Sequence, residues 1–178
     1  MDHKIMKEFV QGLGAGEASR VLQVLLDSDP GLVKKAYRAA VEVAGDVDPY
    51  EIMDDVFSSL ENLDEDDLGS RAGRTRYGYV EPCDAAWEMF EEALGPFIYE
   101  MKRNQERALP AVAKAHCIGI IKGLQRYEGE SISELSDWLV DAPGEFIDTV
   151  VMEWKKGNPS EEDIEEVMGI ARGSLPTL

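Results

Sequence analysis

The residues best suited to chemistry lie in one short stretch, LGSRAGRTRYGYVEP, at residues 68 to 82. Its basic and aromatic side chains are Arg71, Arg74, Arg76, Tyr77 and Tyr79. Guanidinium groups bind carboxylate and phosphate in a bidentate geometry, and tyrosines add stacking surfaces and hydroxyl donors. One interpretation of this pattern is therefore an anion-binding or phosphate-binding loop.

The same arginines have a second interpretation, in which they serve structure alone. The chain has 36 Asp and Glu against 18 Lys and Arg, a formal net charge of −18. Residues 70–80 carry +3, whereas residues 1–69 carry −10 and residues 81–178 carry −11. The loop can therefore fold back and neutralise the acidic segments on either side. We favour this intramolecular role.

The remaining candidates for chemistry do not form a catalytic or metal-binding pattern. His116 and Cys117 are adjacent, hence on different faces of a helix, and no second His or Cys lies three or four residues away. The acidic run ENLDEDDL lacks the spacing of a calcium loop, and GLGAG follows a helix, whereas a dinucleotide-binding loop follows a strand. The sequence therefore assigns no catalytic residue, no metal and no cofactor, and an enzyme is the less favoured class.

The elements that must position these residues have helical periodicity. Asp29-Pro30 and Asp48-Pro49 each pair an N-cap residue with a proline in the first turn, which predicts two helix starts. Ser160 and Gly173 bound a further predicted helix. The apolar stripes of two helices recur at one-turn spacing: Val21, Leu22, Leu25 and Leu26 in one, and Ile52, Val56 and Leu60 in the other.

A central helix is predicted for ALPAVAKAHCIGIIKGLQRY, because apolar residues occupy almost every side of it. Its small residues, which include Gly119 and Gly123, permit close approach of neighbouring backbones. The preceding segment continues its apolar pattern through Pro96, which indicates either one kinked helix, our preference, or two helices end to end. We expect one shared core that contains Trp87, Phe90, Leu94, Ile120, Ile121 and Leu124.

These patterns together predict an all-α fold of about eight helices and no sheet. The architecture is a helical bundle or a short α-solenoid of the HEAT or TPR type, and the recurrence of Asp-Pro fits either a repeat or two separately capped helices. We expect a single domain over residues 1–178, with an irregular basic loop at about residues 62–82.

Composition limits the functional classes. The apolar runs are shorter than the roughly 18 residues of a membrane span, so we expect no membrane segment. Two cysteines, Cys83 and Cys117, are typical of free thiols in a reducing compartment, which predicts a cytoplasmic location. The acidic balance argues against a nucleic-acid partner, because phosphate binding needs a concentrated cationic face.

Three longer segments carry a resemblance to a known family: RAGRTRYGYVEPCDAAWEMFEEALGPFIYEMKR, GIIKGLQRYEGES and SDWLVDAPGEFIDTVVMEWKKG. They resemble a family of uncharacterised helical proteins from archaea and bacteria, some of whose relatives accompany SWIM zinc-finger proteins. The likeness covers roughly residues 50–156. It implies an α-helical, HEAT-like or TPR-like module of unknown function. The zinc-finger cysteines and histidine are absent here, so no metal role carries over.

The sequence favours a helical protein–protein interaction module. The alternative is an anion-binding or phosphate-binding protein or enzyme that uses the Arg71, Arg74 and Arg76 loop. A third hypothesis is an acidic mimic of nucleic acid, which we rank last because the carboxylates are spread over most predicted helices instead of one surface. The expected partner is a protein, and a homo-oligomer is compatible with the sequence.

Overall fold

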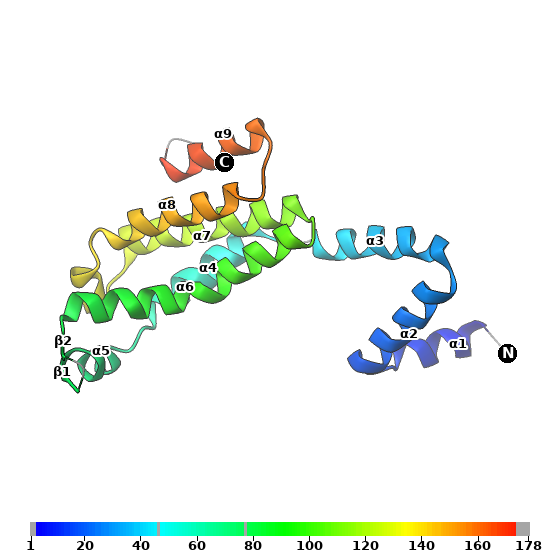
Figure 1. Ribbon diagram of the computed structural model, residues 1–178, viewed down its shortest axis with the longest axis horizontal. Helices are drawn as coiled ribbons and strands as arrows, with labels where there is room; N and C mark the ends of the chain where they lie inside the picture. Colours follow the sequence, from blue (N-terminus) through cyan, green and yellow to red (C-terminus); the bar gives the residue numbers. More distant parts are fainter. Residues whose placement is uncertain (1–2, 46, 77, 174–178) are drawn as a thin grey trace. The chain divides into compact units, whose positions relative to one another are not determined.

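The computed structural model describes residues 3–45, 47–76 and 78–173. The chain divides into two compact units, Met1–Ala44 and Gly45–Leu178, where the sequence analysis expects one domain. We call them the N-terminal unit and the C-terminal unit. The elements in chain order are α1 (His3–Gln11), α2 (Ala15–Ser28), α3 (Pro30–Ala44), α4 (Pro49–Glu61), α5 (Glu65–Arg71), β1 (Gly73–Thr75), β2 (Gly78–Val80), α6 (Pro82–Glu106), α7 (Pro110–Glu130), the 3₁₀ helix η1 (Glu134–Trp138), α8 (Ala142–Lys155) and α9 (Glu161–Ala171) (Figure 1).

The predicted all-α class is confirmed, with one local difference. Helices make up most of the described chain, and the only strands among the described residues are β1 and β2, which pair into a two-stranded antiparallel ribbon. The expectation of no sheet is therefore wrong at this ribbon. The segment at 62–82, expected to be an irregular loop, contains α5 and the ribbon. A HEAT-like or TPR-like arrangement stays a prediction.

The C-terminal unit is a bundle built around α7. This helix packs against α4, α6, α8 and α9, and Figure 1 shows α4, α6 and α8 running beside it. The central position follows from the sequence, because α7 presents apolar side chains on several faces and so must be surrounded. The predicted central helix is confirmed. In the same unit, α6 continues as one helix through Pro96.

Side-chain caps fix several helix starts as the sequence predicts. The Asp48 carboxylate accepts the backbone N–H of Tyr50 at 2.9 Å at the start of α4. The Asp29 carboxylate accepts the N–H of Gly31 at 2.8 Å where α3 begins. These bonds satisfy amides that the helix itself cannot pair, and the prolines that follow each aspartate have no amide to satisfy. Ser160 caps α9 in the same way through the N–H of Asp163.

The predicted core is present, with one member at its edge. Phe90, Leu94, Ile120, Ile121 and Leu124 are fully buried in a single cluster. Trp87 is half-buried and packs against that cluster, with its ring stacked on Phe146 at a centroid distance of 5.0 Å. Six of the elements of the C-terminal unit contribute to the cluster: α4, α6, α7, η1, α8 and α9. One core therefore holds this unit together.

Two glycines of α7 bring it unusually close to α4. A Cβ atom built on Gly119 would lie 2.6 Å from Ile52 Cβ and 2.8 Å from the carbonyl oxygen of Pro49. A Cβ atom on Gly123 would lie 2.6 Å from Val56 Cβ. The two glycines are four residues apart and share one helix face. The contact between α4 and α7 therefore requires residues without a side chain on that face.

Helix α9 is attached to α7 by charged and polar side chains. Lys114 Nζ lies 2.6 Å from Asp163 Oδ1 and 2.7 Å from Glu166 Oε2. These two carboxylates raise the pKa of Lys114, and the hydrogen bond from Lys114 lowers the pKa of Asp163. Gln125 Nε2 also donates to the carbonyl of Ile170 at 2.8 Å. The ion pairs at α9 therefore weaken as pH falls and Asp163 gains a proton.

The N-terminal unit differs from the C-terminal unit in the burial of its side chains. It contains α1, α2 and α3, of which α2 and α3 pack against each other. Among its described side chains none is buried, and only a few, such as Leu26, Leu32 and Ala36, are partly covered. The unit therefore lacks an internal core of its own. Helices of this length form only marginally in water without tertiary packing.

Within the described part of the chain, none of the helices combines the length and the apolar character that crossing a membrane requires.

Candidate functional site

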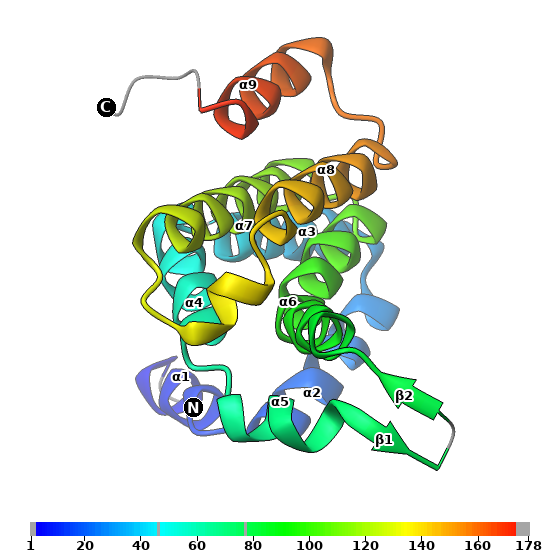
Figure 2. The same cartoon turned by 90° about the vertical axis from the view of Figure 1, so that its left-hand side faces the viewer.

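The basic segment is held at the end of α5 in the C-terminal unit. Asp64 begins α5 by accepting the N–H of Asp66 at 2.9 Å. After α5, β1 and β2 pair so that Arg74 lies opposite Tyr79 and Gly73 opposite Val80. Gly73 has a φ of 95° and Gly78 a φ of 141°, conformations that favour glycine. The glycines of this stretch are therefore what allows it to fold as a ribbon (Figure 2).

Arg71 is engaged with carboxylates of its own chain. Its Nε donates to Asp67 Oδ2 at 2.9 Å, and its Nη1 donates to Glu92 Oε2 at 2.8 Å. The second bond joins α5 to α6. The hydrogen bond from Arg71 lowers the pKa of Asp67, and Glu92 is the largest contributor that raises the pKa of Arg71. These contacts support the structural role that the sequence analysis favours for this arginine.

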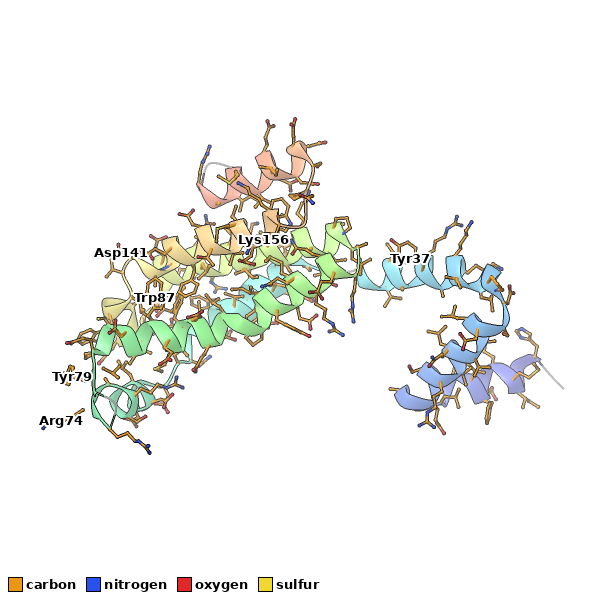
Figure 3. All side chains as sticks on the ribbon, viewed as in Figure 1. Tyr37, Arg74, Tyr79, Trp87, Asp141 and Lys156 are labelled. Carbon is orange, nitrogen blue, oxygen red and sulfur yellow. The ribbon has the colours of Figure 1, made fainter. Side chains whose placement is uncertain are left out.

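The other candidate residues are spread along the ribbon. Arg74 and Arg76 are exposed, and Tyr79 is 64% exposed on β2. Figure 3 shows Arg74 and Tyr79 at the ribbon, away from the core. Tyr77 lies outside the described residues. The structure therefore brings Arg74 and Tyr79 together, and an anion site at this segment stays a prediction.

The surface next to the ribbon carries the opposite charge from the one an anion site needs. A shallow hollow of about 360 Å³ lies beside Val80 and is lined by Trp87 and three acids, Asp84, Glu88 and Glu91. The carboxylates that line this hollow repel phosphate and other anions. The hollow therefore adds no support to an anion ligand at this end of the unit.

Replacing Arg71 tests the two interpretations of the basic segment. We expect Arg71→Gln to lower the melting temperature in low salt, because Asp67 and Glu92 lose their common partner. Added salt should shrink the difference from the parent, since exposed ion pairs are screened. Thermal melts at two salt concentrations measure both effects.

Arg74→Gln is the matched control, since it removes an exposed guanidinium of the ribbon. We expect a smaller change in melting temperature for this variant than for Arg71→Gln. An unchanged melting temperature for Arg71→Gln, together with lost binding of inorganic phosphate, would instead identify Arg71 as a ligand of an anion.

His116 and Cys117 have the environment of packing residues. Cys117 is completely buried in the core, and burial raises the pKa of its thiol to about 12. Burial also lowers the pKa of His116. A thiol of such high pKa is neither a nucleophile nor a ready metal ligand at neutral pH. Among the residues that the structure describes, no group of three or more His, Cys, Asp or Glu is arranged to hold a metal ion.

A second candidate site is the apolar surface of the N-terminal unit. Each of its helices carries a stripe with the spacing i, i+1, i+4, i+5, which places the side chains on one face. We call these the N-terminal stripes, and they comprise Ile5, Met6, Phe9 and Val10 of α1, Val21, Leu22, Leu25 and Leu26 of α2, and Leu32, Val33, Ala36 and Tyr37 of α3.

The large side chains of these stripes are mostly exposed. Phe9 is 72% exposed, Leu22 is 48% exposed and Leu25 is 46% exposed. Figure 3 shows Tyr37 projecting from α3. Of the large apolar side chains exposed in the described chain, the greater part belongs to α1, α2 and α3. Exposed apolar side chains that gather on helix faces in this way are typical of interaction sites.

The two units also differ in charge. The N-terminal unit has six Lys and Arg and six Asp and Glu, so its formal net charge is zero. The C-terminal unit has 12 basic and 30 acidic residues and carries the whole net charge of −18. The apolar surface therefore lies on the neutral unit.

Sequence reasoning found the stripe of α2 but assigned no function to it. The signal that could have identified the surface was the recurrence of the same spacing in three successive helices. The sequence analysis used the periodicity of this segment only to predict a helix, and apolar stripes are usually core. Only exposure in the folded chain distinguishes a covered stripe from an open one.

Comparison with known proteins gives no match: no family model, no curated protein and no solved structure resembles the chain closely enough to be identified as a relative. The helical fold agrees with the family resemblance at the level of fold class, while membership of that family and an association with zinc-finger proteins stay predictions.

Proposed function

We propose that this protein is a helical protein–protein interaction module that binds its partner through the N-terminal stripes. The observation that carries the proposal is the exposure of three successive apolar helix faces in a unit without a buried core. The C-terminal unit, by contrast, buries its apolar faces in one complete cluster.

The free energy of ordering the N-terminal unit supports this assignment. Fixing the backbone of each residue costs roughly 1–2 kcal/mol, and burial of apolar surface is the main compensation. The described side chains of α1, α2 and α3 offer little of that compensation among themselves. A partner that covers the stripes would supply it, as amphipathic helices commonly gain stability from tertiary packing.

The proposal is tested by altering one stripe and measuring what the full chain retains. We expect the double variant Leu22→Glu, Leu25→Glu to lose proteins that the parent captures from an extract of its source cells. Glutamate keeps helix propensity close to that of leucine, so the change acts through the surface more than through the helix.

Val24→Glu is the matched control. Val24 is 66% exposed on the same helix but lies outside the stripe, so the control introduces the same acidic residue on another face. Capture that is equal for the parent and for both variants would contradict the proposal. Loss of capture with the stripe variant and retention with the control would support it.

Anion binding by the arginine ribbon is the second candidate function. Its support is the exposure of Arg74 beside Tyr79. Against it stand the engagement of Arg71 with Asp67 and Glu92 and the acidic hollow next to β2. We therefore rank it below protein binding.

A further inference from the structure

We infer that the partner of the N-terminal stripes is a second copy of this chain, so that the protein self-associates through α1, α2 and α3. This inference rests on the proposed function and names its partner. It follows from the charge of the N-terminal unit, from the apolar character of its stripes and from the charge of the C-terminal unit.

The charge of the N-terminal unit permits self-association. Two copies of a surface with a net charge of zero do not repel each other, and basic and acidic residues lie on all three of its helices or at their ends. The helical spacing places Lys7 and Glu8 on the side of α1 away from its stripe, and it places Lys34, Lys35, Arg38 and Glu42 on the corresponding side of α3. Two copies that pair through their stripes therefore do not bring these charges into direct contact.

A two-fold interface requires a surface that complements itself, because the same patch lies on both sides. Apolar stripes meet this requirement, since apolar surface binds apolar surface without direction. A surface of one charge sign would not.

The charge of the C-terminal unit argues against this unit as the principal self-association surface. Its net charge of −18 makes two C-terminal units repel each other when their surfaces meet directly. Three of its exposed large apolar side chains, Tyr50, Tyr99 and Met152, come from separate elements, α4, α6 and α8, whereas the remaining group at or beside η1 is smaller than the N-terminal stripes. The N-terminal unit is therefore the part of the chain suited to pair with its own copy.

The inference predicts the mass of the full chain in solution. Sedimentation equilibrium over a concentration series should give a species of about twice the chain mass of 19.8 kDa. We expect Leu22→Glu, Leu25→Glu to raise the dissociation constant by roughly 100-fold or more, because each buried interface leucine that becomes charged costs at least about a factor of ten. Phe9→Glu, in α1, should weaken association in the same direction.

Two controls keep the result interpretable. Val24→Glu should dimerise like the parent, because it leaves the stripe of α2 unchanged. All three tryptophans, Trp87, Trp138 and Trp154, lie in the C-terminal unit, so their fluorescence shows whether that unit still folds when the N-terminal unit is altered. Raised salt should not dissociate the parent dimer, because apolar contacts are not screened.

Each outcome decides the inference. A dimeric parent, a dimeric Val24→Glu variant and monomeric stripe variants support it. A parent that stays monomeric over the whole series overturns it, and the proposed function then survives only if the stripe variant still loses a captured protein of another kind. A parent and stripe variants that dimerise equally overturn it, because the interface then lies outside the N-terminal stripes.

Discussion

Replacing Ile120 by alanine is expected to lower the free energy of unfolding by about 2 to 5 kcal/mol. Ile120 is fully buried on α7, the helix that packs against α4, α6, α8 and α9. The substitution removes buried methyl groups and leaves a cavity that the surrounding helices fill only in part. Urea unfolding followed by tryptophan fluorescence measures the change.

Ile132→Ala is the matched control for this prediction. Ile132 is 91% exposed just after α7, so the same truncation there should change the free energy of unfolding by less than about 0.5 kcal/mol. If Ile120→Ala also changed stability by less than that amount, α7 would not be the central helix of the unit.

Replacing Gly119 by alanine is expected to destabilise the C-terminal unit by about 1 to 3 kcal/mol. The new methyl group would lie 2.6 Å from Ile52 Cβ and 2.8 Å from a backbone oxygen of α4. These distances are too short, so the two helices must move apart. Alanine favours helix over glycine by about 1 kcal/mol, so a loss of stability means that the steric effect exceeds the gain in propensity.

Gly129→Ala provides the control on the same helix. No atom of another element lies within 4 Å of the Cβ position at Gly129, so only helix propensity acts there. We expect unchanged or slightly higher stability, by up to about 1 kcal/mol. Equal effects at Gly119 and Gly129 would show that α4 and α7 do not pack as closely as described.

The parts of the fold that could be predicted from sequence are those set by local chemistry. Asp48 before Pro49 specifies a helix start, because the carboxylate satisfies an amide within the first turn. The apolar pattern of α7 specifies a central helix, because apolar residues occupy almost every side of it. Gly119 and Gly123 mark a close helix contact, although sequence does not tell which helix makes it.

The parts that could not be predicted depend on residues far apart in the chain. The bond between Arg71 and Glu92 spans 21 residues, and any of many acids could have been the partner. The ribbon of β1 and β2 is too short to show strand alternation, and its glycines indicate only a turn. The exposure of the N-terminal stripes is likewise a property of the folded chain, because the same spacing describes core helices.

The dissociation constants for self-association of two variants test the central claim most directly, because the variants alter the same helix on different faces. Leu22→Glu, Leu25→Glu changes the stripe of α2, and Val24→Glu changes another face of that helix. If the N-terminal stripes bind a second copy, the constant of the stripe variant exceeds that of the Val24→Glu variant by roughly 100-fold. Equal constants would contradict the claim.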